Sequence, residues 1–226
     1  MNIRPIAKIH TDFSTKFGIP RQGNLIEELK AQIIFDEEFK NPEALRGLEE
    51  FSHIWLIWGF SANARKEWSP TVRPPRLGGN KRVGVFATRS PFRPNPLGLS
   101  LVKLEGIEKT KKDGMVLHVS GADLMDKTPI YDIKPYLPHI EAIPDAAGGF
   151  AERVKDYKLI VSCEEELLNL LPEGKRQALL SALSQDPRPS YQNSKERIYG
   201  FVFAGFEVKF QVVGDVLYVR EIAKNE

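Results

Sequence analysis

Apolar and polar residues alternate with a period of two along much of the chain, which is the pattern of β-strands. The clearest example is 206–212, where Phe206, Val208 and Phe210 alternate with charged and amide side chains. Further strands are predicted at 3–10, 29–35, 53–60, 99–107, 115–122, 157–161 and 216–222. The segment 53–60 is almost continuously apolar, which is typical of a strand covered on both faces. We interpret His53 at its start as a hydrogen-bonded core residue rather than a catalytic one.

Helical signals are few and lie at 42–46, 163–171 and 175–185. Asn41 can cap the first helix, proline is tolerated at its first position, and Gly47 would end it. Ser162 and Glu165 have the spacing of a capping box for the second. The third would stop before the Asp-Pro pair at 186–187.

Many strands and few helices precede residue 150, and no GxGxxG motif follows a strand. This pattern argues against a doubly wound sheet and favours a closed or nearly closed β-barrel. The Asp-, Ala- and Gly-rich segment 144–152 is typical of a linker. We therefore predict a mainly β, α+β protein, with a small β-barrel domain at 1–150 and a small α+β domain at 154–226.

Composition narrows the class of protein further. The chain has 226 residues, of which 42% are hydrophobic and 27% charged, as in ordinary globular proteins. No apolar run is long enough to cross a bilayer, and the N-terminus lacks the apolar stretch of a signal peptide. The single cysteine, Cys163, excludes an internal disulfide, so we expect a cytoplasmic protein. No partner base lies near Cys163 in sequence, so a near-core position is favoured over a nucleophile.

Charge is unevenly distributed, although the net charge is only +2. Between residues 65 and 93 there are eight basic residues and one acid, Glu67. Such an excess of basic residues is typical of a surface that binds a polyanion. Trp68 and Phe92 in the same span could stack on bases. An ordinary solvated basic face is the alternative.

The segment 83–100 contains a polar loop between two predicted strands. Three prolines fix its backbone and thereby present Arg89, Arg93 and Asn95 with little freedom. A stiff polar loop of this kind is where function usually lies. A purely structural turn remains the alternative.

A second polar stretch, 121–138, holds Asp123, Asp126, Asp132 and Lys134. The carboxylates lack a histidine pair and the dense oxygen ligands of hard-metal loops, so no metal is expected. Nothing in the spacing supports a hydrolase in which Asp126 and Asp132 form an acid/base pair. Asp132 and Lys134 share one face of a strand, where they can line a pocket or form a surface ion pair.

Several long motifs occur together: Arg73–Gly79, Gly84–Ser90, Phe92–Pro96, Asp132–Tyr136 and Asp186–Tyr191. In this combination and order they resemble the TrmO (TsaA-like) family over essentially the whole chain. The resemblance implies a homodimeric β-barrel that binds S-adenosylmethionine near the subunit interface. It also implies methyl transfer to the exocyclic N6 amine of threonylcarbamoyl-adenosine, next to the anticodon of threonine tRNA.

The resemblance also assigns candidate residues for the cofactor: Gln22, Gly23, Asn24, Leu25, Ser61, Ala62, Arg89, Leu99, Ala122, Asp123 and Leu124. One departure lies close by. Related sequences commonly have glycine where this chain has Lys127, and lysine adopts a positive φ poorly. The turn at 126–127 is therefore expected to be less favourable here.

Roles in catalysis follow from the same motifs. The amine is conjugated to the purine and to a carbonyl, so it must lose a proton as it attacks the methyl group. We expect Asp132 to be the base or orienting group and Asn95 to hold the purine edge. Lys134 and Tyr136 would position the substrate carboxylate or carbonyl. The arginines expected to contact tRNA phosphates are Arg73, Arg76, Arg93 and Arg188.

A non-catalytic RNA-binding module with the same basic loops is the rival hypothesis. It predicts tRNA binding without uptake of S-adenosylmethionine.

Overall fold

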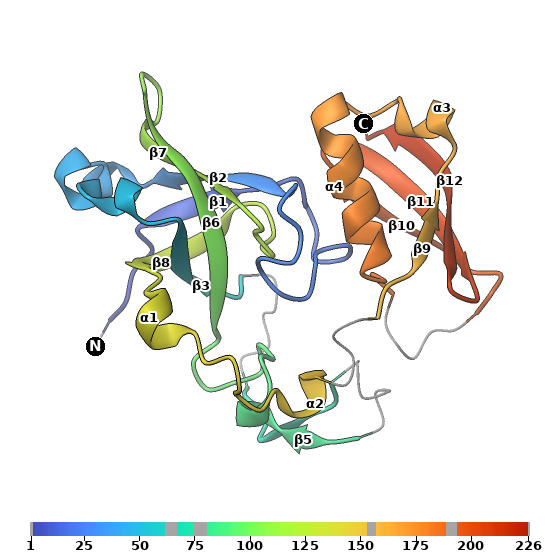
Figure 1. Ribbon diagram of the computed structural model, residues 1–226, viewed down its shortest axis with the longest axis horizontal. Coiled ribbons are helices and arrows are strands. Elements are labelled where there is room, and N and C mark those ends of the chain that lie inside the picture. The colour runs from blue at the N-terminus through green and yellow to red at the C-terminus, as the bar shows by residue number, and fades with distance from the viewer. Residues whose placement is uncertain (1, 62–66, 75–80, 153–156, 189–193, 226) are drawn as a thin grey trace.

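The computed structural model describes residues 2–61, 67–74, 81–152, 157–188 and 194–225. Within these ranges antiparallel strands close a barrel in the order β1-β2-β7-β6-β3-β8 (Figure 1). The strands are β1 Ala7–His10, β2 Lys30–Phe35, β3 His53–Gly59, β6 Leu97–Thr110, β7 Gly114–Ser120 and β8 Thr128–Pro135. The predicted barrel is confirmed.

The barrel interior is filled by the apolar residues of the alternating pattern. Ile9, Ile33, Leu56, Leu117 and Ile130 are completely buried there. Burying such side chains stabilises the fold by about 1.5–3 kcal/mol each. The barrel core therefore follows directly from the period-two pattern.

The expectation that 53–60 is covered on both faces is wrong. Ile54 and Leu56 are fully buried, but Trp55 and Ile57 on the outer face are only partly buried. A strand in a barrel wall needs one apolar face only, because only its inward face packs in the core. His53 is also only partly buried, and its Nδ1 lies 3.0 Å from the Ser52 hydroxyl.

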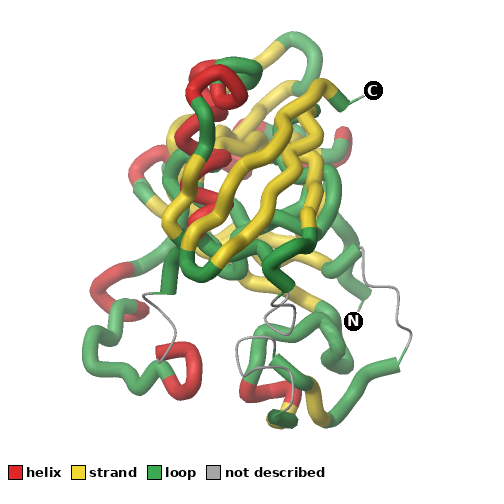
Figure 2. Tube along the Cα trace, turned by 90° about the vertical axis from the view of Figure 1, so that its right-hand side faces the viewer, coloured by secondary structure: helices red, strands yellow, loops and turns green. Residues whose placement is uncertain are grey.

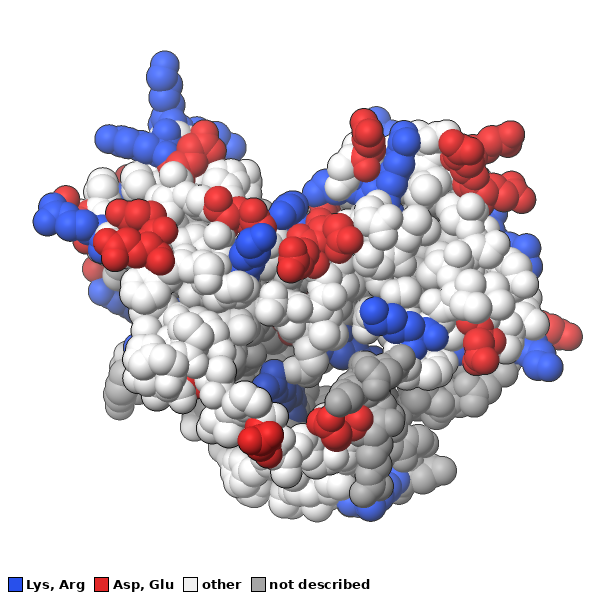
Figure 3. Space-filling model, in the orientation of Figure 1, with Lys and Arg blue, Asp and Glu red and all other residues white. Residues whose placement is uncertain are grey.

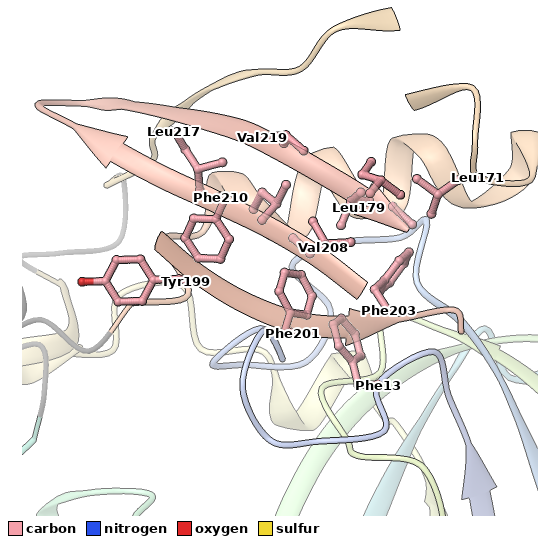
Figure 4. Packing of buried hydrophobic residues seen from close by; sticks show 14 of the residues in the cluster. Phe13, Leu171, Leu179, Tyr199, Phe201, Phe203, Val208, Phe210, Leu217 and Val219 are labelled. Atoms are coloured by element: carbon pink, nitrogen blue, oxygen red, sulfur yellow. The ribbon is translucent and has the colours of Figure 1, made fainter. Parts of the chain in front are cut away.

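The C-terminal part forms a sheet in the order β10-β11-β12-β9, with β9 parallel to β12 and the other pairs antiparallel. Its elements are β9 Ile160–Ser162, α3 Glu165–Leu168, α4 Glu173–Ser184, β10 Ile198–Phe203, β11 Phe206–Val213 and β12 Val216–Lys224. Helix α4 covers one face, where Leu179, Phe203 and Phe210 are fully buried (Figure 4). The α+β character is confirmed, although β10 is not predicted from the sequence.

A second hydrophobic cluster is centred on this sheet, and it also includes Phe13, Ile26 and Leu29 from the N-terminal part of the chain. The division of the chain between residues 150 and 154 therefore stays a prediction.

Two helix predictions need correction. The segment beginning at Pro42 is a 3-10 helix, η2 Pro42–Leu45, although Asn41 caps it as expected by accepting a hydrogen bond from the Glu43 amide. The capping box is wrong: α3 has no side-chain cap, because Ser162 is the last residue of β9 and pairs with Tyr218. Helix α4 is confirmed.

Short elements occupy the remaining connections. The 3-10 helices are η1 Glu37–Phe39, η3 Leu48–Glu50 and η5 Val85–Ala87, and the short α-helices are α1 Pro138–Glu141 and α2 Gly149–Glu152. Strands β4 Thr71–Val72 and β5 Val83–Gly84 pair with each other. The segment around β5 and helix α2 lie below the barrel and the sheet in Figure 1, and Figure 2 shows these lower loops from the side. Within the described residues, no helix has the length and apolarity to span a membrane.

Candidate active site

The loop after β5 is held by its own hydrogen bonds. Thr88 Oγ1 donates to the Val85 carbonyl at 2.8 Å and accepts from the Ser90 amide at 3.2 Å. Arg93 Nη1 donates to the Thr88 and Ser90 carbonyls at 3.0 and 3.3 Å. Arg93 therefore rigidifies the loop, while part of its side chain remains accessible.

Loop residues far apart in sequence meet beside β6. Arg89 donates to the Gln22 side-chain carbonyl, and the Asn24 amide donates to the Gly121 carbonyl at 2.8 Å. A Cβ at Gly23 would lie 2.8 Å from the Leu101 carbonyl oxygen, so only glycine allows this approach. The structure thus brings together four predicted cofactor residues, Gln22, Gly23, Asn24 and Arg89.

Asp123 is the acidic centre of this group. Its Oδ1 accepts from the Ser100 hydroxyl at 2.5 Å, and Ser100 in turn accepts from the Trp58 indole at 2.9 Å. Burial raises the pKa of Asp123, and the Ser100 bond and the charge of Arg89 partly offset this. A carboxylate in this setting favours a ligand that offers hydroxyl or amine donors. Sequence reasoning missed Ser100 and Trp58, because nothing local marks a strand serine as the partner of a distant carboxylate.

The other predicted cofactor residues divide into two kinds. Ala122 and Leu124 are buried in the barrel core, so any contact with a cofactor would use their backbone atoms. Leu25 and Leu99 are about half exposed and can offer apolar surface. Ala62 lies outside the described residues.

A hollow of about 510 Å³ opens where β3 ends and β6 begins. This volume suits a small ligand or a nucleobase. Ser61 and Asn95, predicted for different roles, come together here. The described residues that line it are Ile3, Gly59, Phe60, Ser61, Asn95, Pro96, Leu97, Pro129 and Tyr131.

A β-bulge places Tyr131 at this hollow. Ile57 pairs with Asp132 but Trp58 pairs with Ile130, which leaves Tyr131 as the extra residue. The Tyr131 ring lies over Gly59, where an added Cβ would be 2.6 Å from Cε2. Bulges commonly re-aim side chains beside active sites. Sequence reasoning missed Tyr131, and the only signal was a glycine at the end of a strand.

Asp132 and Lys134 lie on the outer face of the barrel. The Asp132 carboxylate and the Lys134 ammonium group are 2.9 Å apart, so the predicted shared face is confirmed. Ile57 pairs with both Asp132 and Leu99, so these two residues flank it with Cα atoms about 10 Å apart. Asn95, in contrast, lines the hollow. Tyr136 packs edge-on against Trp55, with ring centroids 6.0 Å apart.

The predicted phosphate-binding arginines differ in exposure. Arg73 is exposed, and Arg76 lies outside the described residues. Arg188 is buried and donates to Asp186 through Nε at 2.8 Å and Nη2 at 3.0 Å. Although burial alone would raise it, these bonds hold the pKa of Asp186 below its usual range. Arg188 therefore has an internal ion pair, and its contact with a phosphate stays a prediction.

The turn that contains Lys127 keeps its left-handed geometry. Lys127 has a φ of 63°, and its amide donates to the Ile9 carbonyl at 2.8 Å. The substitution of lysine for the glycine of related sequences therefore leaves the turn in place, at a cost in backbone strain.

The structure is a closed antiparallel barrel whose loops bring together a buried carboxylate and an arginine, with a mostly apolar hollow at its rim. These features define a non-Rossmann, barrel-type protein with a candidate ligand site. A family model described as tRNA-methyltransferase O N-terminal domain matches residues 8–142, and one described as TrmO C-terminal domain matches residues 159–225. The chain therefore belongs to the TrmO family.

Curated relatives and solved structures agree with this assignment. The chain is 40% identical to a tRNA (adenine(37)-N6)-methyltransferase from Escherichia coli, over 92% of this chain and 91% of that protein. It is 52% identical to a protein of the same name from Eikenella corrodens, over 78% of this chain and 99% of that protein. A crystal structure of TrmO from Pseudomonas aeruginosa superposes with a TM-score of 0.80 at 33% identity and covers 100% of this chain and 97% of that one.

Proposed function

We propose that the protein transfers a methyl group from S-adenosylmethionine to the N6 amine of adenosine 37 in tRNA. The observation that carries this proposal is the assembly of Gln22, Gly23, Arg89 and Asp123 beside β6 in a chain of the TrmO family. The finer substrate is threonylcarbamoyl-adenosine in threonine tRNA, and the setting is the cytoplasm.

The residues beside β6 fit this cofactor. The backbone at Gly23 and Asn24 packs closely against its neighbours and can contact a ligand. The Asp123 carboxylate can accept a hydrogen bond from an amine or a hydroxyl group. Leu99 offers apolar surface on the adjoining outer face. We further propose that a second copy of the chain covers this face, which makes the active enzyme a homodimer with its cofactor site near the interface.

S-adenosylmethionine supplies an electrophilic methyl group on a sulfonium. The residues of the chain align the target amine and remove its proton. The hollow holds the purine, with Asn95 at its edge and the Tyr131 ring as a wall. Asp132 accepts the proton, and Lys134 and Tyr136 orient the carboxylate or carbonyl of the substituent.

Asp132→Asn tests the assignment of the base. The amide keeps the size of the side chain but cannot accept the proton at neutral pH, so the single-turnover rate of methyl transfer should fall by about 10²–10⁴-fold. The change should leave the affinity for S-adenosylmethionine within about twofold. An unchanged single-turnover rate would remove Asp132 from this role.

tRNA would approach along the loops below the barrel. Arg73, Lys81 and Arg82 are exposed there, and Arg93 is partly exposed. Arg76, outside the described residues, stays a proposed phosphate contact. On the face seen in Figure 3, by contrast, acidic and basic side chains are interspersed over the barrel and the C-terminal sheet. Phosphate contacts from the loops would make tRNA affinity fall steeply with salt.

A thermal shift assay separates this enzyme from the non-catalytic RNA-binding module. A ligand that binds only the folded protein raises the melting temperature by mass action. We expect S-adenosylmethionine at 100 times its Kd to stabilise the protein by roughly 2.7 kcal/mol, and methionine, which lacks the adenosine, to have little effect. A melting temperature that does not respond to S-adenosylmethionine would favour the RNA-binding module.

A further inference from the structure

The segment 11–29 connects β1 to β2 of the barrel, yet most of its apolar side chains pack against the C-terminal sheet. Phe13, Ile26 and Leu29 are buried in the second hydrophobic cluster, and Phe17 and Ile19 pack against it. Figure 4 shows Phe13 beside Phe203 and Phe201 of β10. The predicted cofactor residues Gln22–Leu25 lie in the middle of this segment.

The first attachment is at the start of the segment. The Asp12 carboxylate pairs with Lys175 of α4 at 2.7 Å, and the Ala204 amide donates to the Asp12 carbonyl at 2.9 Å. The Phe13 and Phe203 rings meet edge to face, with centroids 5.3 Å apart. We call the sheet β10-β11-β12-β9, with its helices and loops, the C-terminal unit. Residues 12 and 13 are therefore fixed to it by an ion pair, a backbone hydrogen bond and a ring contact.

The second attachment is aromatic. The Phe17 ring stacks on Phe210 at 6.4 Å with an interplanar angle of 8°, and meets Phe201 edge-on at 6.2 Å. Gly18 follows with a φ of 95°, and a Cβ there would be 2.4 Å from the Phe201 ring. The chain therefore runs directly over β10.

The third attachment adjoins the cofactor residues. Arg21 Nη2 donates to the Arg188 carbonyl at 3.0 Å and to the Asp186 carbonyl at 3.4 Å. These carbonyls are themselves fixed, because Asp186 and Arg188 form an ion pair and Tyr157 donates to Asp186 at 3.1 Å. The next residue, Gln22, turns to the barrel side and accepts from Arg89.

We propose that the C-terminal unit positions the cofactor loop, Gln22–Leu25. Arg21 is the positioning residue, because it ties the backbone just before this loop to the C-terminal unit. The inference rests on the proposed binding of S-adenosylmethionine at this loop. In this proposal, the ion pair between Asp186 and Arg188 holds in place the two carbonyl groups to which Arg21 donates. Arg21 touches neither substrate and acts through the backbone that follows it.

The experiment compares Arg21→Met with Arg176→Met in the full chain. Arg176 is a matched control, because it also donates to two carbonyls, Leu171 at 3.1 Å and Asn169 at 3.5 Å, but within the C-terminal unit. Melting temperatures, the Kd for S-adenosylmethionine without tRNA, and steady-state kinetics are measured for both variants. Lys175→Met, which breaks the attachment at Asp12, is a second test variant.

We expect Arg21→Met to raise the Kd and the KM for S-adenosylmethionine about tenfold, on the order of one charge-assisted contact, with the KM for tRNA nearly unchanged. Lys175→Met should raise the Kd for S-adenosylmethionine by a smaller factor. Arg176→Met should lower the melting temperature but leave the Kd for S-adenosylmethionine unchanged. Equal Kd values in all four proteins would overturn the positioning role. If the wild-type chain itself fails to bind S-adenosylmethionine, the proposed function fails instead.

Discussion

At the scale of single residues, the site depends on backbone conformations that side chains tolerate unequally. Asn24 has a φ of 60°, a conformation that asparagine adopts more readily than most residues. Lys127 has a φ of 63° without that advantage. Asn24 belongs to the proposed cofactor segment Gln22–Leu25, whereas Lys127 lies in the turn after Asp126 and its amide bonds to the Ile9 carbonyl. The strain at Lys127 is therefore not part of the chemistry of the site.

Lys127→Gly should therefore stabilise the protein. Removing the left-handed strain gains about 1–2 kcal/mol, and the greater freedom of glycine in the unfolded chain returns about 0.4–1 kcal/mol of it. We expect a net gain of about 0.5–1 kcal/mol, measured by urea unfolding. Lys112→Gly is the control, because Lys112 is an exposed turn residue without a positive φ and should gain nothing. A loss of stability in Lys127→Gly would contradict this account of the turn.

At the scale of elements, the bulge in β8 decides which residues face the hollow. Without the bulge, Tyr131 would pair with a residue of β3, and the pairing of Asp132 with Ile57 would shift by one residue. Such a shift moves side chains to the opposite face of the strand. Gly59 on β3 is the complementary feature, because its missing side chain leaves room for the Tyr131 ring.

Gly59→Ala tests this pairing of ring and glycine. The added Cβ would lie 2.6 Å from Tyr131 Cε2, so the ring must move out of its position in the hollow. We expect kcat/KM for tRNA to fall at least tenfold, or about 1.4 kcal/mol of transition-state stabilisation. Gly84→Ala should change it less than twofold, because no described residue lies within 4 Å of a Cβ at that position. Equal activity in the two variants would show that Tyr131 has no part in the site.

The sequence predicted most of the elements but not how they meet. Period-two alternation was enough to place β2, β6 and β11, and the same-face pairing of Asp132 with Lys134 followed from strand geometry. The bulge at Tyr131 was not predictable, because one extra residue breaks the period without a sequence signature of its own. The burial of Arg188 was missed for a similar reason, since an arginine in a proline-rich loop resembles an exposed one until its carboxylate partner is placed.

At the scale of the whole molecule, the cofactor loop lies between two hydrophobic cores. The barrel supplies Arg89, Ser100 and Asp123, and the C-terminal sheet anchors the segment that brings Gln22 to them. Figure 1 shows this segment, in blue, running between the barrel and helix α4. In the proposed positioning role, the C-terminal unit holds the segment whose residue Gln22 meets Arg89.

Nucleoside mass spectrometry of threonine tRNA tests methyl transfer to the N6 amine of adenosine 37. Threonine tRNA carrying threonylcarbamoyl-adenosine is incubated with the protein and S-adenosylmethionine, digested and analysed. We expect a nucleoside heavier by one methyl group, about 14 Da, with fragmentation that places the methyl on N6. In a single turnover it should form about 10²–10⁴-fold more slowly when Asp132→Asn replaces the wild type. Unmodified threonylcarbamoyl-adenosine after incubation with a protein that binds both S-adenosylmethionine and the tRNA would contradict it.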